Sequence, residues 1–169
     1  VRQILELRGL VGAGRTELVR AIIGADIRTG GTATIRTNGK VKQITSYRSA
    51  VKNALAYIPE ERRTDGLALT MSVADNVALP NRGALSQLGV LIFGKIAKFS
   101  KRLADAVGLR PPEIRRDAGD FSGGNQQKIV LAKWLGREPS VIVLDEPEED
   151  GGTDTGKRGA NPAAQGLKQ

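Results

Sequence analysis

The sequence has 169 residues, of which 40% are hydrophobic and 26% are charged, which is typical of a globular chain with one core of domain size. It contains no cysteine and no histidine, which excludes disulfides, thiolate metal sites and imidazole general-base chemistry. Lysine and arginine outnumber aspartate and glutamate by 26 to 18, but these charges are spread out and only 4% of residues are aromatic, so no nucleic-acid partner is expected. No basic-then-apolar leader and no long apolar run is present, so neither a signal peptide nor a membrane span is expected.

The first predicted elements are a strand, a glycine-rich loop and a helix. Residues 4–7 predict the strand, and residues 9–16 fit the phosphate-loop pattern GxxxxGK[ST] at every defined position except the lysine, which is Arg15. The helix carries Leu18 and Ile22 at helical spacing and is expected to stop at Gly24. A plain strand-to-helix turn is the alternative interpretation of such a glycine pattern.

A phosphate loop of this kind has a clear chemical logic. Gly9, Gly12 and Gly14 would let successive backbone N–H groups surround a phosphate, and Thr16 could place its hydroxyl on Mg²⁺. Arg15 is wider and planar where a lysine ammonium is a compact point charge. We therefore expect it to hold a phosphate but to fit the transition state of phosphoryl transfer less well.

The next segments predict an antiparallel hairpin, a short helix and a second strand. The hairpin is indicated by residues 32–36 and 41–44, which flank the turn signal Asn38-Gly39. Residues 47–53 can form the short helix, and residues 55–58 form the strand, which leads into a charged loop. Loops at strand ends are where function usually lies.

The middle of the chain is predicted to be mostly helical. Ser72 begins a capping box that should start one helix, and a later helix is expected to end at Gly108. The apolar face of that later helix is formed by Ile96, Phe99, Leu103, Ala106 and Val107. A third helix, after Gly124, is apolar on more than one side.

Two further segments carry chemistry near the end of the chain. In residues 121–127, Phe-Ser-Gly-Gly-Asn-Gln-Gln, a serine and two glycines ahead of a helix leave free N–H groups that can bind phosphate. Residues 141–144 predict a buried strand that delivers Asp145 and Glu146 to a sheet edge. Asp145 could orient a metal and Glu146 could activate a water, although a solvated strand end is the simpler interpretation of such a pair taken alone.

Together these segments resemble the ATP-binding-cassette ATPases. The stretches GLVGAGRTE, YIPEERRTDGL, MSVADN, FSGGNQQKIVLAKWL and VIVLDEP are similar to the second cassette of the ATP-binding subunits of bacterial ribose, galactose and xylose importers. The resemblance runs from about Leu5 to Pro147. It implies an α/β fold with a P-loop NTPase core, a β-ribbon and a helical subdomain at about residues 68–135, within a nucleotide-binding domain of residues 1–147 that is incomplete at both ends.

The resemblance also implies site residues, cofactors and partners. ATP and Mg²⁺ would be the cofactors, with Glu146 catalytic and Thr16 and Asp145 at the metal. The residues implied to contact nucleotide are Gly9, Gly12, Gly14, Arg15, Thr16, Glu60, Ser122, Gly123, Gly124 and Gln126. Among these, Glu60 stands where cassettes usually have the Q-loop glutamine, and Ser122, Gly123 and Gly124 form the signature motif. Another cassette, in a head-to-tail sandwich, and permease subunits would be the partners, at the cytoplasmic face of the membrane.

The departures from the family pattern suggest impaired hydrolysis. Residues 148–169 do not follow the family and are expected to form a disordered tail, and a reading-frame shift near Glu148 would explain the sudden change. Because Arg15 replaces the lysine and the family's switch histidine is absent, we expect a poor ATPase. The alternative is a non-catalytic module that binds nucleotide and lends its signature to a partner cassette. A DNA-repair or chromosome-maintenance cassette would need long coiled-coil heptads, which the sequence lacks.

Overall fold

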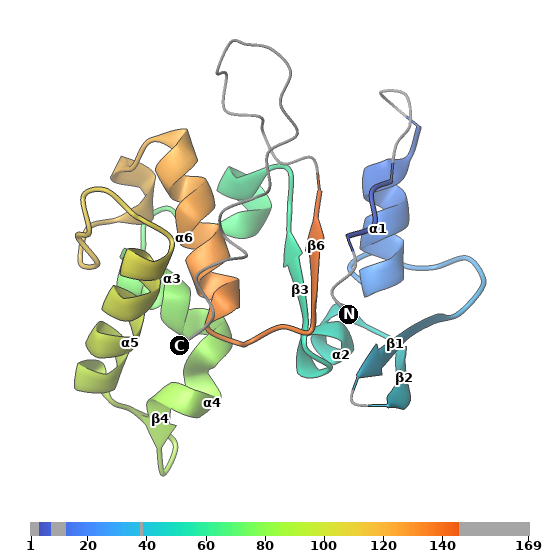
Figure 1. Cartoon of the computed structure of the whole chain (residues 1–169), viewed down its shortest axis with the longest axis horizontal. Coiled ribbons are helices and arrows are strands. Elements are labelled where there is room, and N and C mark those ends of the chain that lie inside the picture. The colour runs from blue at the N-terminus through green and yellow to red at the C-terminus, as the bar shows by residue number, and fades with distance from the viewer. Residues whose placement is uncertain (1–3, 8–12, 38, 146–169) are drawn as a thin grey trace. The chain divides into compact units, whose positions relative to one another are not determined.

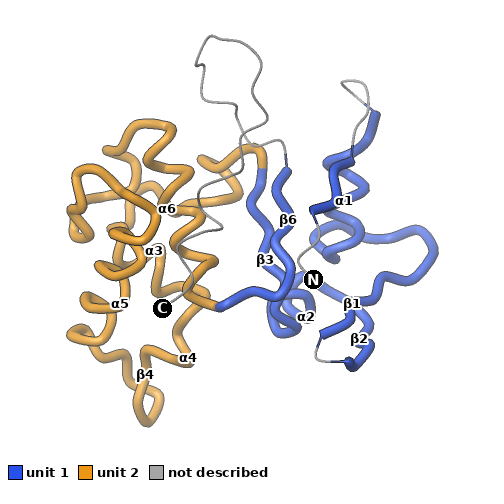
Figure 2. Tube along the Cα trace, in the orientation of Figure 1, with its two compact units in different colours: residues 1–59, 138–145 blue, residues 60–137, 146–169 orange. Residues whose placement is uncertain are grey.

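The computed structural model describes residues 4–7, 13–37 and 39–145. These residues form two compact units, shown in different colours in Figure 2. Unit 1 combines the chain up to Pro59 with Glu138–Asp145, and unit 2 contains Glu60–Arg137. Gly9, Gly12, Glu146 and the predicted tail at 148–169 lie outside the described residues, so the predictions made for them are untested by the structure.

Unit 1 has an α/β composition (Figure 1). Its elements are α1 (Arg15–Ile23), β1 (Ala33–Thr37), β2 (Lys40–Ile44), α2 (Tyr47–Lys52), β3 (Leu55–Ile58) and β6 (Val141–Leu144). Strands β1 and β2 pair antiparallel, and β3 and β6 pair in parallel. Its core cluster contains Val19, Ile23, Ala33, Ile35, Ile44, Ala50, Leu55 and Tyr57. The predicted ribbon and parallel pairing are both present.

The hairpin forms where the sequence predicts it. Thr37 pairs with Lys40, and Gly39, just before Lys40, has a φ of 74°. A two-residue turn of this kind needs positive φ values that glycine adopts without strain. Ala33 and Ile35 point into the core while their neighbours are exposed, which is the alternation of a half-buried strand.

Two details of unit 1 differ from the sequence prediction. Residues 4–7 lie in no strand. Helix α1 forms and stops at Gly24 as predicted, but it buries Val19 and Ile23, whereas Leu18 is 52% and Ile22 41% exposed. Both pairs have a spacing of four residues, so helical periodicity cannot choose between them, and packing against the core cluster decides.

Strand β6 is less buried than its apolar sequence predicts. Val141, Ile142 and Leu144 are 38%, 41% and 51% exposed. Among the described residues β6 has a hydrogen-bonded neighbour on one side only, which is β3. A strand is buried on both faces when a sheet and its covering helices surround it, so this prediction was wrong for the described part of the chain.

Unit 2 is mainly helical. Its elements are the π-helical turn η1 (Arg62–Gly66), α3 (Val73–Ala78), the 3₁₀ turn η2 (Leu79–Asn81), α4 (Arg82–Leu85), β4 (Ser86–Gln87), β5 (Val90–Leu91), α5 (Phe93–Ala106), the 3₁₀ turn η3 (Ala118–Asp120) and α6 (Gly123–Leu135). Strands β4 and β5 form a two-residue antiparallel hairpin. Over the described ranges, no helix is both long and apolar enough to span a bilayer.

The predicted helix signals in unit 2 are mostly confirmed. Ser72 caps α3, because its hydroxyl accepts a hydrogen bond from the backbone N–H of Asp75 at 3.1 Å. In α5, Ile96 and Leu103 face inward as expected, but Ala106 is exposed. Helix α6 buries side chains around much of its circumference, namely Gln126, Ile129, Val130, Ala132 and Trp134.

Candidate nucleotide site

The start of α1 has the backbone geometry of a phosphate-binding turn. Gly14 precedes the helix with a φ of 74°, and no side chain caps the first turn. The first N–H groups of a helix have no partner inside the helix and carry the positive end of its dipole. Arg15 and Thr16 are half-buried at this end. The described half of the predicted phosphate loop therefore presents donors, a cation and a hydroxyl together.

Thr16 and Asp145 meet in unit 1 although they lie far apart in the sequence. Asp145 directly follows β6, and its backbone N–H donates to the carbonyl of Ile58 at 3.0 Å, which continues the parallel pairing with β3. The Thr16 hydroxyl donates to Oδ1 of Asp145 at 3.1 Å. Asp145 is only 5% exposed. The structure therefore brings together the two residues that the resemblance places at the metal.

Tyr57 completes the hydrogen bonding of this carboxylate. Its hydroxyl donates to Oδ2 of Asp145 at 2.8 Å, and the side chain is buried. Burial, with a smaller contribution from the hydrogen bond and charge of Asp145, raises the pKa of Tyr57 well above its ordinary value. The tyrosine is therefore a neutral donor at physiological pH. Each oxygen of Asp145 accepts one hydrogen bond and retains a further lone pair for a ligand.

The donor set fits Mg²⁺ rather than a metal held by protein side chains alone. Within the described ranges no group of three or more aspartate, glutamate, histidine or cysteine side chains gathers as a metal cage. Mg²⁺ prefers oxygen ligands and is usually held by one or two protein oxygens together with substrate phosphates and water. Thr16 and Asp145 supply two such oxygens beside the start of α1.

The predicted signature motif lies at the start of α6 in unit 2. Ser122 precedes the helix in extended conformation and is exposed, as is Gly124. The amide of Asn125 donates to the Ser122 hydroxyl oxygen at 3.1 Å and to the carbonyl of Arg110 at 2.7 Å. Asn125 therefore fixes the position of the serine side chain at an open helix end.

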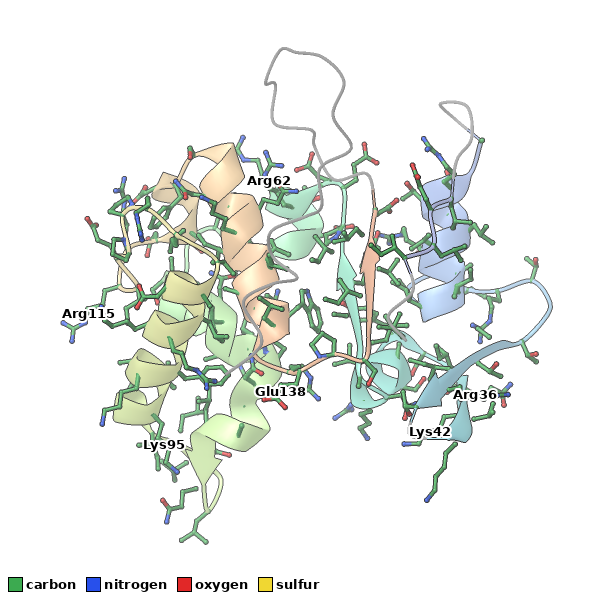
Figure 3. All side chains as sticks on the ribbon, viewed as in Figure 1. Arg36, Lys42, Arg62, Lys95, Arg115 and Glu138 are labelled. Carbon is green, nitrogen blue, oxygen red and sulfur yellow. The ribbon has the colours of Figure 1, made fainter. Side chains whose placement is uncertain are left out.

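Arg62 lies against Gly123, the first residue of α6. A Cβ atom built on Gly123 would lie 2.6 Å from Nη2 of Arg62, so the guanidinium occupies the space beside this glycine. Figure 3 labels Arg62 near this end of α6. The turn η1 that carries Arg62 is held to α6 by Lys133, whose ammonium donates to the carbonyl of Gly66 at 2.8 Å. Burial lowers the pKa of Lys133.

Gln126 and Glu60 are also predicted to contact nucleotide, and one of them is buried while the other is exposed. Gln126 is only 3% exposed, and its amide nitrogen donates to the carbonyl of Phe121 at 2.9 Å, so this group supports the motif from within. A nucleotide contact for Gln126 stays a prediction. Glu60 is exposed at the start of unit 2, and its carbonyl accepts a hydrogen bond from Arg62.

The predicted residues thus form two groups, each within one unit. Unit 1 brings together Gly14, Arg15, Thr16 and Asp145, and unit 2 brings together Ser122, Gly123, Gly124 and Gln126. Sequence reasoning missed Tyr57 and Asn125. The polar Asn125 inside the motif was a usable signal, whereas the contact of Tyr57 depends on the pairing of β3 with β6 and leaves no local pattern.

A glycine-led helix start, a threonine beside it and a carboxylate at the end of a parallel strand define the P-loop class of nucleotide-binding proteins. The family model described as ABC transporter matches residues 2–149, so the chain belongs to the ABC transporter family.

Curated relatives include several sugar import proteins. The chain is 40% identical over 158 residues to the "Ribose import ATP-binding protein RbsA" of Roseobacter denitrificans, which covers 94% of the chain and 30% of that protein. It is 42% identical over 172 residues to a "Putative ribose/galactose/methyl galactoside import ATP-binding protein 1" of Agrobacterium fabrum. That alignment covers 98% of this chain and 33% of that protein. It is 39% identical over 156 residues to the "Xylose import ATP-binding protein XylG" of Thermoanaerobacter pseudethanolicus. That alignment covers 92% of this chain and 30% of that protein. The chain therefore spans about a third of the length of these relatives.

A solved structure supports the fold. The dimeric post-hydrolysis state of the ATP-binding cassette MJ0796, bound to ADP and Pi, superposes with a TM-score of 0.63 at 16% identity, covering 80% of this chain and 56% of that one. At this identity the likeness establishes the P-loop α/β fold alone.

Proposed function

We propose that this chain is an ATP- and Mg²⁺-binding part of a carbohydrate importer. The observation that carries the proposal is the hydrogen bond between Thr16 and Asp145, which pairs a hydroxyl and a carboxylate beside the open start of α1. The similarity to ribose, galactose and xylose import proteins supports a carbohydrate as the transported substrate. Which sugar is carried is a property of other parts of such a system.

In this proposal the chain's own groups divide the work. Backbone N–H groups of the glycine loop and the charge of Arg15 hold the phosphates, while Asp145 and Thr16 orient the metal side of the site. When bound, Mg²⁺ neutralises charge on the terminal phosphates. Glu146 is assigned the alignment of the attacking water. Glu60, at the Q-loop position, would face permease subunits at the cytoplasmic side of the membrane.

We further propose that hydrolysis is weak. Arg15 presents a broad planar cation where a compact ammonium suits the transition state. The proposal of weak hydrolysis would be refuted if the purified chain hydrolysed ATP steadily and lost that activity on Glu146→Gln. Arg15→Lys is the matched gain-of-function test, because it keeps the charge and restores the usual shape. Turnover that does not rise with Arg15→Lys would show that Arg15 is not the limiting residue.

A second candidate function is supported by the open end of α6. Ser122 and Gly124 are exposed there, and Asn125 holds the serine hydroxyl in place. In this role the chain binds nucleotide weakly and lends residues 122–124 to a catalytic partner cassette, in a head-to-tail sandwich. Mixing the chain with an intact first cassette tests this role. If Ser122→Arg leaves the partner's turnover unchanged, the second role is wrong.

The domain organisation is part of the same proposal. We assign residues 1–147 to a single nucleotide-binding domain and about 68–135 to its helical subdomain. Limited proteolysis in the presence of ATP and Mg²⁺ tests the assignment. A protected fragment that ends near residue 147 supports it, and cleavage by trypsin within that range that ATP does not slow would contradict it.

A further inference from the structure

The hairpin formed by β4 and β5 carries an unusual turn. Ser86 pairs with Leu91 and Gln87 with Val90, which leaves Leu88 and Gly89 as the two turn residues. Their φ values are 51° and 82°. Turns of this type favour asparagine, aspartate or glycine at both positions, because a side chain is strained at positive φ. A leucine therefore stands at a position where its backbone conformation is unfavourable.

This leucine gains nothing from burial. Leu88 is 99% exposed, and the neighbouring Val90 and Phe93 are 68% and 83% exposed. An exposed leucine with a strained backbone, close in sequence to two further exposed apolar side chains, points to a function outside the folded core. The hairpin tip, which comprises Leu88 and Val90, is thus an apolar projection of unit 2, and Phe93 is exposed at the start of α5, directly after the hairpin.

The base of the hairpin is fixed to the core. The backbone N–H of Ile92 donates to the carbonyl of Leu85 at 3.1 Å, and Leu85 is buried in a cluster with Ala78 and Ile96. The tip therefore extends from an anchored base.

The chain around the hairpin tip is basic. Residues 76–104 contain no aspartate or glutamate, and their basic side chains are Arg82, Lys95, Lys98, Lys101 and Arg102. All of these basic residues are exposed. Figure 3 labels Lys95 on the end of α5 that follows the hairpin. Apolar side chains flanked by cations match the two layers of an anionic bilayer surface, where acyl chains lie beneath negative headgroups.

We propose that the hairpin tip, together with Phe93 and the exposed basic side chains of α5, forms a docking surface for anionic phospholipid membranes. These basic side chains are Lys95, Lys98, Lys101 and Arg102. Leu88, Val90 and Phe93 would enter the boundary between headgroups and acyl chains, while Lys95 and Lys98 contact the headgroups. The exposed aliphatic side chains of Leu88 and Val90 favour this occupant over a nucleic acid, because a bilayer has an apolar layer to receive them and a nucleic acid has none. The proposal goes beyond ATP binding and does not depend on it, since unit 2 alone carries the surface.

Sedimentation of the full chain with extruded vesicles tests the proposal. Vesicles of phosphatidylcholine with about 25 mol% phosphatidylglycerol should bind the chain about tenfold more tightly than pure phosphatidylcholine at low salt. Leu88→Gly should weaken that binding about fivefold while the chain unfolds at the same or a higher temperature, because glycine relieves the turn. Lys95→Glu with Lys98→Glu should remove the preference for anionic vesicles.

Ala54→Gly is the matched control. Ala54 belongs to unit 1 and has a φ of 62°, so its replacement relieves a similar strain without changing any residue of unit 2 and should leave vesicle binding unchanged. Equal binding to both vesicle types, or full binding by Leu88→Gly, would overturn the proposal. So would binding that appears only when vesicles contain permease subunits, because a protein would then be the occupant. ATP affinity measured on the same samples reports separately on the proposed function.

Discussion

The hydroxyl of Tyr57 donates a hydrogen bond of 2.8 Å to Oδ2 of Asp145, across 88 positions of sequence. Asp145 receives its second hydrogen bond from Thr16, at the opposite oxygen. A carboxylate held at both oxygens has little rotational freedom. A metal ligand whose orientation is fixed by its neighbours binds more tightly than one that must be ordered on binding.

Replacing Tyr57 by phenylalanine should therefore weaken the metal dependence of nucleotide binding. The ratio of ATP affinity with Mg²⁺ to that with EDTA should fall about tenfold, since loss of outer-sphere partners typically costs this much. The unfolding free energy should fall by about 1 to 2 kcal/mol. Tyr47→Phe is the control, because Tyr47 is also packed on the core of unit 1, whereas the tyrosine that donates to Oδ2 of Asp145 is Tyr57. Equal ratios in both variants would contradict the prediction.

Gly24→Ala should destabilise the chain far more than Gly39→Ala. Both glycines have positive φ values, 76° and 74°, so both substitutions strain the backbone by about 1 to 2 kcal/mol. A Cβ on Gly24 would also lie 2.7 Å from the carbonyl carbon of Ser46, whereas nothing lies within 4 Å at Gly39. We expect a total cost of about 3 kcal/mol or more at Gly24. Urea unfolding measures the difference, and similar costs would show that the contact with Ser46 relaxes freely.

The two tyrosines should make folding less favourable at high pH. Burial raises the pKa of Tyr47 from 10 to about 12, and Tyr57 is shifted in the same direction. A tyrosine whose pKa is raised in the folded state stabilises it fully below pH 10 and loses that contribution as the pH rises toward 12. Between pH 10 and pH 12 the unfolding free energy of Tyr47→Phe should therefore fall by about 2 kcal/mol less than that of the parent chain. Ultraviolet titration of tyrosinate would contradict this if both residues ionised near their ordinary pKa while the chain was folded.

Asn76→Ala should cost about 3 kcal/mol of unfolding free energy. This side chain is fully buried, and its amide oxygen accepts from Ala68 while its amide nitrogen donates to the carbonyls of Ala68, Met71 and Ser72. Truncation removes these four hydrogen bonds and leaves the backbone N–H of Ala68 without its side-chain partner, whereas the three carbonyls keep hydrogen bonds from the backbone N–H groups of Met71, Ala118 and Asn76. Gln87→Ala, on the exposed strand β4, should be nearly neutral. Equal effects of the two substitutions in thermal unfolding would refute this account.

The parts of the fold that local chemistry determines could be predicted from sequence. The Asn38-Gly39 turn and the Ser72 cap depend on residues within a few positions of each other, and both elements form where they were expected. The inward face of α1 and the exposure of β6 depend on what packs against them. Neither the choice of Val19 over Leu18 nor the hydrogen bond from Tyr57 is visible in a local pattern.

Unit 1 is interrupted in sequence, because Glu138–Asp145 returns to it after the whole of Glu60–Arg137 has formed unit 2. During synthesis the chain emerges from its amino end, so unit 2 can complete its fold before β6 exists to pair with β3. Asp145 follows Thr16 by 129 positions in the sequence. In the proposed function, nucleotide can therefore bind through this pair only after β6 has been synthesised and has joined β3. The time at which a nascent chain first binds nucleotide would therefore report when β6 pairs with β3 and completes unit 1.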